Sequence, residues 1–308
     1  MTALPLYTRL IHSDWSTSPR KRWTATAVRE KTGRRAIAPS RVSDTELFLS
    51  SLFEGGLTLS GFDFPIGLPD SYGQKTGLED FCSALDAFGS GPWSDFYKVA
   101  NVAGEISIFR PFYPQRSTSN ARQVHLVDAH SCGSIEELRR QCERATVSRR
   151  AACSLFWTLG GNQVGKAAIS GWKEIIGPAR HLGAKLWPFE GSLETLANVC
   201  DLVLAETYPG EAYGHVGVKF ATGESKRRQS DRAKVAVGIS SWAHSSNVIL
   251  TPKLVSLINN GFGPQADGED AFDAVMGLFG MIEVIDGRRE EGPMHEGKWE
   301  GWILGQSE

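Results

Sequence analysis

Four acidic residues occur in this sequence where an unpaired charge would be costly. Asp14, Asp63 and Glu206 each lie near the end of a short apolar run of the strand type, and Asp273 lies inside a long apolar helical run. Burying one carboxylate alone costs several kcal/mol, so carboxylates at successive strand ends indicate convergence on a positive group. A divalent cation with oxygen ligands fits this pattern, and the matching chemistry is metal-assisted phosphodiester hydrolysis.

The acidic residues near the start of the last helical run, GEDAFDAVMGLFGMI, differ in what they indicate. Asp270 lies in the expected first turn, where a carboxylate also complements the helix dipole. Asp273 lies one turn further in, among apolar neighbours, and shares a face with Asp270 at the i, i+3 spacing. Gly277 and Gly280 would let this helix approach a sheet closely. We expect the metal ligands to be Asp14, Asp63, Asp270 and Asp273, and the catalytic residues to be Asp14, Asp63, Glu206 and Asp273.

Structural roles are the alternatives for these carboxylates. Aspartate often stabilises a local turn, and this alternative applies to Asp14 and Asp63. Pro65 closely follows Asp63 and ends regular strand pairing, as expected at the rim of a site. Glu206 ends a buried run just before a Tyr-Pro turn. The expected cation is Mg²⁺ or Mn²⁺, because several hard oxygen ligands converge and no His/Cys cluster suits zinc.

A basic run, KRRQSDR, follows the segment that contains Glu206. The formal net charge of the chain is −2, so any site for a polyanion must be local. We expect this run to hold substrate phosphates; a solvated helix face is the alternative. The expected substrate-binding residues are Lys226, Arg227, Arg228 and Arg232.

The elements that must position these residues begin with a strand-rich segment. LYTRLIHSDW, KRWTATAVRE and RRAIAPSR predict three consecutive antiparallel strands separated by turns. Ser43 and Asp44 predict the cap of a helix over TELFLSSLFEG, and LTLSGFDF predicts a fourth strand. Because a helix intervenes, the fourth strand is able to run parallel to the first through a crossover. Asp14 and Asp63 would then lie at the same sheet edge.

The remaining chain divides into an irregular segment and a second run of regular elements. Residues 70–197 mix short helical pieces with Trp, Pro and Gly, and we interpret them as a largely helical and irregular insertion. DLVLAETYP then predicts a fifth strand, followed by helices. We expect the first half of the core in residues 1–69 and its second half, with the acidic C-terminal helix, in residues 198–308.

Composition limits the class of protein. The 308 residues are 41% hydrophobic and 22% charged, which is typical of a globular protein. Its five cysteines are odd in number and form no CxxC pair, which favours reduced thiols over a disulfide framework. No signal-peptide pattern occurs, and no apolar run approaches the roughly 18 residues needed to cross a bilayer. We expect a cytoplasmic protein with no membrane partner.

Several segments together resemble one family. GFDFPIGLP, AETYPGEAYG, KRRQSDR, GEDAFDAVMGLFGMIE and EGWILG resemble the family called domain of unknown function 429, whose members are described as predicted nucleases of ribonuclease H fold. The resemblance covers both ends and the fifth-strand region, and little of residues 70–160. It implies a ribonuclease H-like α/β fold, a mixed five-stranded sheet flanked by helices, and a metal-dependent phosphodiesterase.

The resulting expectation is a Mg²⁺- or Mn²⁺-dependent nuclease or phosphodiesterase that acts on a nucleic acid or a small phosphoester. Two alternatives stay open. An actin-like ATP-dependent phosphotransferase shares the core sheet and uses acidic residues at strand ends, but would need a duplicated core and glycine-rich nucleotide loops. A non-catalytic adaptor for nucleic acid or protein would have dispersed carboxylates that bind no metal.

Overall fold

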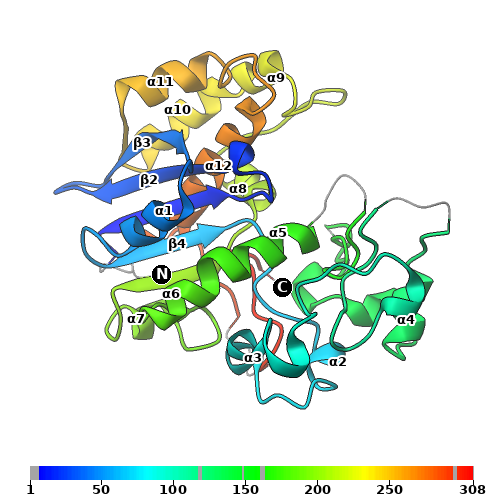
Figure 1. Ribbon diagram of the computed structural model, residues 1–308. Coiled ribbons are helices and arrows are strands. Elements are labelled where there is room, and N and C mark those ends of the chain that lie inside the picture. The colour runs from blue at the N-terminus through cyan, green and yellow to red at the C-terminus, as the bar shows by residue number, and fades with distance from the viewer. Residues whose placement is uncertain (1–6, 117–119, 148, 160–163, 294–296, 308) are drawn as a thin grey trace. The chain divides into compact units, whose positions relative to one another are not determined.

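The computed structural model describes residues 7–116, 120–147, 149–159, 164–293 and 297–307 (Figure 1). The chain forms two compact units. The first comprises residues 1–63, 179–292 and 303–307, and the second comprises residues 64–178, 293–302 and 308. The expected insertion, 70–197, shares residues 70–178 with the second unit, whereas residues 179–197 belong to the first.

A mixed sheet of seven strands forms the centre of the first unit, in the order β5-β6-β4-β1-β2-β3-β7. The strands are β1 (Arg9–Asp14), β2 (Trp23–Arg29), β3 (Arg34–Arg41), β4 (Thr58–Phe62), β5 (Lys185–Leu186), β6 (Leu202–Glu206) and β7 (Val248–Leu250). The first three are antiparallel neighbours, and β4 runs parallel to β1, as the sequence predicts. β6 is parallel to β4.

The expectation of five strands is wrong, because the sheet has seven. The two additional strands, β5 and β7, lie at its two edges and contain only two and three residues. Segments this short have no alternating pattern that the sequence could reveal. The α/β class, with helices flanking a mostly parallel sheet, agrees with the expectation.

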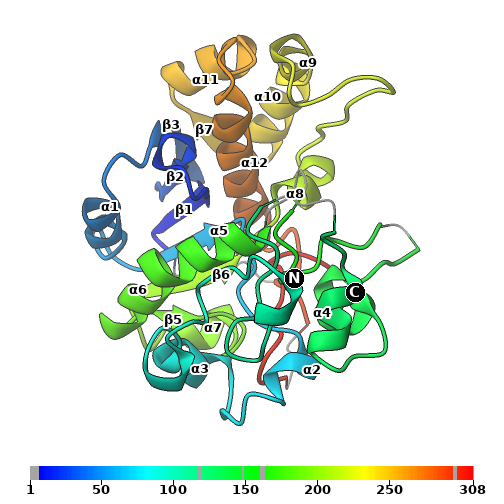
Figure 2. The ribbon, with the colours of Figure 1, turned by 45° about the vertical axis from the view of Figure 1, so that its right-hand side comes forward.

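Helices cover both faces of this sheet. They are α1 (Thr45–Leu52), α6 (Gly177–His181), α7 (Leu193–Leu196), α8 (Pro209–His215), α9 (Gln229–Lys234), α10 (Ala236–Ser245), α11 (Pro252–Asn259) and α12 (Gly268–Ile285), with a 3₁₀ turn at Pro19–Lys21. α1 begins at the predicted cap, where the Asp44 carboxylate accepts hydrogen bonds from the backbone N–H groups of Glu46 and Leu47 at 2.9 and 3.0 Å. Figure 2 shows α1 and α12 on opposite sides of the strands β1 to β3.

The two faces can be assigned from alternation along β1. His12 contacts α12, because its Nδ1 lies 3.0 Å from the Ala274 carbonyl oxygen. Trp15 packs against Phe48 of α1, with ring centroids 6.1 Å apart, and against Phe62. Side chains alternate between faces along a strand, so the even-numbered residues of β1, including Asp14, lie on the α12 face.

The long helix α12 has 18 residues and is buried on nearly every side. It packs on β1 and β2 and also on α8, which explains why its sequence is apolar all round. Gly277 and Gly280 make these contacts close. A Cβ at Gly277 would lie 2.2 Å from His12 Cε1, and one at Gly280 would lie 2.7 Å from Ala212 Cβ.

The second unit contains short helices and turns around an aromatic core. Its helices are α2 (Asp70–Gly73), α3 (Phe81–Ala87), α4 (Val124–Ala129) and α5 (Val164–Gly171), with a π-helical turn at Trp172–Ile176 and 3₁₀ turns at Gly91–Trp93, Ala103–Glu105, Ile135–Leu138 and Gln141–Glu143. The ring centroid of Phe112 lies 5.7 Å from that of Phe96 and 5.4 Å from that of Phe156. All five cysteines of the chain are free thiols, and within the described residues no helix is long and apolar enough to cross a membrane.

A candidate carboxylate site at the carboxyl ends of β1 and β4

Asp14 and Asp63 lie side by side at one edge of the sheet. Asp14 is the last residue of β1, and Asp63 directly follows β4. The parallel register pairs Ser13 with Phe62, so the next residue of each strand lies beside its neighbour on the same face. Oδ1 of Asp63 accepts a hydrogen bond of 2.7 Å from the backbone N–H of Trp15, which joins the two strand ends.

Two further aspartates reach this edge from α12. Burial, followed by the neighbouring carboxylates of Asp63, Asp273 and Asp270, raises the pKa of Asp14 well above its ordinary value. Burial also raises the pKa of Asp273. Carboxylates shift one another in this way only when they lie within Coulombic reach in a poorly solvated place. The structure therefore brings together the four residues that the sequence predicts as metal ligands.

The four carboxylates are difficult to ionise together. Burial is the largest cause that raises the pKa of Asp63; the Trp15 N–H opposes this change and Asp273 adds to it, and together these effects bring the pKa to about 7. Burial raises the pKa of Asp270 to about 6, with Lys21 opposing and Glu269 and Asp273 adding to the increase. Near neutral pH the cluster consequently holds protons or needs cations to offset its negative charge.

The ammonium group of Lys226 offsets part of the negative charge of the four carboxylates. Its ammonium donates a hydrogen bond to Oδ2 of Asp273 and lies 3.4 Å from Oε1 of Glu269. Burial disfavours the charge of Lys226, but the carboxylates of Asp273, Glu269 and Asp14 together outweigh this effect and raise the pKa of the lysine. The hydroxyl of Tyr213 donates to Oδ1, the other oxygen of Asp273. Both oxygens of Asp273 therefore have protein partners.

The donor set suits a hard divalent cation. Aspartate oxygens are the ligands that Mg²⁺ and Mn²⁺ prefer, and Oδ2 of Asp270 is buried without a hydrogen-bond partner among the described residues. Within the same described parts of the chain, no three His, Cys, Asp or Glu side chains are close enough to share one ion. Binding a metal here thus requires the carboxylates to close around it.

The structure does not bring Glu206 to the four aspartates. In the parallel register Glu206 is paired with Phe62, and both lie on the α1 face, whereas Asp14 and Asp63 lie on the α12 face. A Cβ at Gly61 would lie 2.6 Å from Thr207 Cγ2 and 2.7 Å from Met281 Sδ, which places Thr207 rather than Glu206 toward α12. Glu206 was expected to join the catalytic residues, but the structure places it on the opposite face of the sheet, because neighbouring residues of a strand point to opposite faces.

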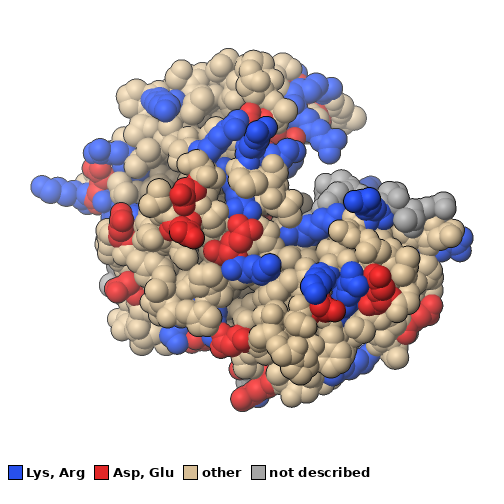
Figure 3. Space-filling model, in the orientation of Figure 1, with Lys and Arg blue, Asp and Glu red and all other residues tan. Residues whose placement is uncertain are grey.

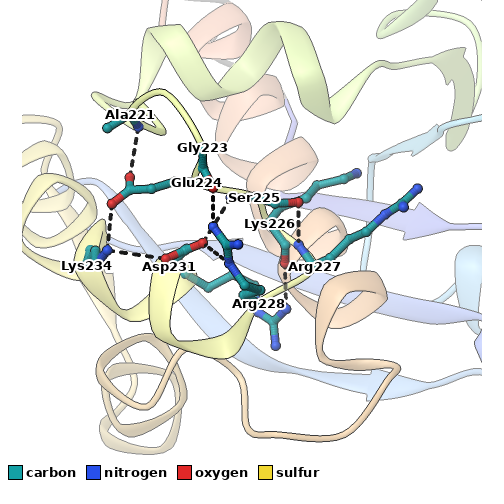
Figure 4. Close-up of polar contacts among 10 residues, drawn as sticks. Ala221, Gly223, Glu224, Ser225, Lys226, Arg227, Arg228, Asp231 and Lys234 are labelled. Atoms are coloured by element: carbon teal, nitrogen blue, oxygen red, sulfur yellow. Dashed lines mark hydrogen bonds and ion pairs between the residues drawn. The ribbon is translucent and has the colours of Figure 1, made fainter.

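Some side chains of the basic run are held by protein partners, and others are free to contact a ligand (Figure 4). Arg228 is paired with Asp231 and also donates to the carbonyl of Gly223. Arg232 is 2% exposed and donates to the carbonyls of Lys226, Gly261 and Gly263. Arg232 therefore stabilises backbone carbonyls instead of presenting its charge to a ligand, contrary to the expectation for it. Arg228 stabilises the loop before α9, although its side chain is 55% exposed.

The side chain of Arg227 has no ion pair among the described residues and points away from the Asp231 pairs in Figure 4. Figure 3 shows basic side chains gathered over the loop that precedes α9. Of the four expected substrate-binding residues, the structure therefore leaves Arg227 available to a ligand and places Lys226 on the carboxylates.

Sequence patterns did not single out Tyr213 or Lys21. Tyr213 lies on α8 and contacts Asp273, and Lys21 ends the 3₁₀ turn after β1 and is close enough to Asp270 to lower the pKa of that carboxyl. No pattern of sequence spacing indicates that either residue contacts an aspartate far away in the chain. Lys21 does have a weak signal, because it lies in the basic turn PRKR that follows Asp14.

No protein-family model, curated protein or solved structure matches this chain.

Proposed function

We propose that the first unit is a ribonuclease H-like, metal-dependent phosphodiesterase. The observation that carries this proposal is the convergence of Asp14, Asp63, Asp270 and Asp273 at the carboxyl ends of parallel strands, with the pKa of each carboxyl raised by burial and by its neighbours. Such a cluster is costly for an isolated protein. A bound divalent cation would remove this cost and give the cluster a chemical use.

The strand order supports the ribonuclease H-like interpretation. Three antiparallel strands, a helix, a strand parallel to the first and a further parallel strand follow one another as β1, β2, β3, α1, β4 and β6. The resemblance to the family called domain of unknown function 429 agrees with this order. An actin-like phosphotransferase would need a duplicated core, and the described residues contain one such sheet.

In this proposal Asp14, Asp63, Asp270 and Asp273 hold Mg²⁺ or Mn²⁺, which would supply Lewis acidity and a more acidic bound water. The Trp15 N–H orients the Asp63 carboxylate by donating to Oδ1. The hydroxyl of Tyr213 orients Asp273 in the same manner. Arg227 and Lys21 would contact phosphates of the substrate, because both are charged and neither has an ion pair among the described residues.

The decisive experiment combines metal binding with hydrolysis. Mn²⁺ is titrated calorimetrically into the wild type, Asp14→Asn and the control Asp201→Asn, which neutralises an exposed aspartate just before β6. The same proteins are assayed with Mn²⁺ on labelled single-stranded and duplex DNA and RNA, and on bis(p-nitrophenyl) phosphate. We expect Asp14→Asn to weaken Mn²⁺ binding by at least about tenfold and to abolish hydrolysis. The control should behave like the wild type.

Wild-type protein that binds no Mn²⁺ and cleaves none of these substrates would overturn the proposal and favour a non-catalytic adaptor. Hydrolysis of bis(p-nitrophenyl) phosphate without cleavage of any nucleic acid would instead indicate a small phosphoester as the substrate.

A further inference from the structure

The ammonium of Lys226 lies where several carboxylates of the site meet. It contacts Asp273 and Glu269 directly. Its charge also acts on Asp14 and Asp63, whose carboxyl groups come from the ends of two strands. A single lysine therefore contacts two carboxylates of α12 and also lowers the pKa of the carboxyl groups at the ends of β1 and β4.

We propose that Lys226 is an internal cation that occupies the carboxylate site and that a divalent metal must displace it in order to bind. This inference rests on the proposed function, because it concerns the same metal site. It assigns to Lys226 control of metal affinity, whereas the sequence suggested contact with substrate phosphates.

Both carboxylate oxygens of Asp273 are already occupied. Tyr213 donates to one oxygen of this carboxylate and Lys226 to the other. A divalent cation bound through Asp273 would lie within a few ångströms of the lysine ammonium. Two positive charges at that separation repel strongly in a poorly solvated place, so both cannot occupy the site together.

Of the two partners of Asp273, Lys226 is the one that can leave. Its side chain is 37% exposed, so a path into solvent is open. Tyr213 has packing that holds it in place, since its ring lies 6.0 Å from Phe220 and 5.6 Å from Phe272. The lysine side chain is therefore the group that moves more easily.

The backbone of the loop that contains Lys226 is held independently of the lysine side chain. Arg232 donates to the Lys226 carbonyl oxygen from a buried position. Asp231 pairs with Arg228 and with Lys234, and Lys234 also pairs with Glu224. Figure 4 shows these pairs on the side of the loop away from the Lys226 side chain. The ammonium can leave Asp273 without unfolding the loop.

The first test compares Mn²⁺ affinity by calorimetry in the wild type, Lys226→Met and the matched control Arg227→Met, which removes the neighbouring positive charge from a side chain without an ion pair. We expect Lys226→Met to bind Mn²⁺ at least about tenfold more tightly than the wild type, because the competing cation is gone. Arg227→Met should keep the wild-type affinity.

The second test uses wild-type protein alone and so does not depend on how the variant folds. Acetylation by acetic anhydride is quantified by mass spectrometry at Lys226 and at the exposed Lys219, with and without Mn²⁺. We expect Mn²⁺ to increase the acetylation of Lys226 and to leave Lys219 unchanged.

The outcomes separate the two proposals. If the wild type and Lys226→Met bind Mn²⁺ equally, or the variant binds it more weakly, the displacement proposal is overturned and the metal site stands. Unchanged acetylation of Lys226 in protein saturated with Mn²⁺ also overturns displacement alone. If neither protein binds Mn²⁺, both proposals fail.

Discussion

His12 of β1 packs directly against Gly277 of α12, where an added Cβ would lie 2.2 Å from His12 Cε1. On the same helix, the carbonyl oxygen of Ala274 lies 3.0 Å from Nδ1 of the histidine. This contact sets the distance between α12 and the sheet. Because Asp273 directly precedes Ala274, it also sets the position of that carboxylate over the ends of β1 and β4.

Gly277→Ala should therefore separate α12 from the sheet. We expect it to lower the free energy of unfolding by about 1–3 kcal/mol through overpacking, and to weaken Mn²⁺ binding because the carboxylates move apart. Urea unfolding and calorimetry measure the two effects. Gly214→Ala on α8 is the control, since a Cβ there has nothing within 4 Å and alanine favours a helix. Equal stability of both variants would show that the close contact is unimportant.

Asp14→Asn should change how the protein responds to metal. Without metal, the variant should melt at the same temperature as the wild type or higher, because one repelling carboxylate is gone. With millimolar Mn²⁺, only the wild type should gain thermal stability. Thermal melts with EDTA and with Mn²⁺ measure both effects. If Mn²⁺ does not stabilise the wild type, and the variant melts much lower in EDTA, Asp14 has a structural role instead.

Asp63 should make stability depend on pH. Burial raises the pKa of this carboxyl in the folded protein to about 7, so the folded state holds the proton more tightly than the unfolded state. The resulting stabilisation is complete below the ordinary pKa, about 4, and is lost as the pH rises toward 7. In EDTA, wild-type stability relative to Asp63→Asn should thus fall by a few kcal/mol over this interval. Urea unfolding at several pH values tests this, and a constant difference would contradict it.

The arginines of the basic run should have different roles in nucleic-acid binding. Arg227→Ala should weaken binding to every sequence and reduce the slope of log affinity against log salt by about 0.9, as expected for one lost phosphate contact. Arg228→Ala should change the slope little, because Asp231 already holds this side chain. Fluorescence anisotropy over a salt series measures both slopes. Equal slopes for the two variants would contradict the prediction that Arg227 contacts a phosphate and Arg228 does not.

Arg232→Ala should act on stability instead. Its guanidinium donates to three backbone carbonyls from a buried position, and removing it leaves these acceptors without partners. We expect the free energy of unfolding to fall by about 2–3 kcal/mol. Urea unfolding measures this, with Arg227→Ala as the matched control. A variant with unchanged stability but weaker nucleic-acid binding would indicate that Arg232 binds substrate.

Local patterns in the sequence were sufficient for much of the core. Short apolar runs and the turn residues between them predicted β1, β2, β3, β4 and β6, and the Ser43-Asp44 cap predicted the start of α1. The apolar setting of Asp273 distinguished it from the acidic residues in the first turn of α12. These features depend on neighbours in the chain, because strand period, capping and helix burial are all expressed within a few residues.

The composition of the site depended on tertiary structure. The face of Glu206 is set by its register with β4, and a shift of one residue reverses the side to which a strand residue points. The short edge strands β5 and β7 exist because longer strands are available to pair with them. Local patterns contain no information about either relationship.

The roles of the charged side chains were likewise decided in three dimensions. Lys226 and Arg232 belong to one basic run in the sequence, yet one contacts the carboxylates and the other is buried on backbone carbonyls. The contact of Tyr213 with Asp273 joins residues 60 positions apart. The type of a residue shows which charge its side chain carries. The partner and the solvation of that charge depend on how distant segments of the chain pack, because Coulombic and desolvation energies depend on distance and burial.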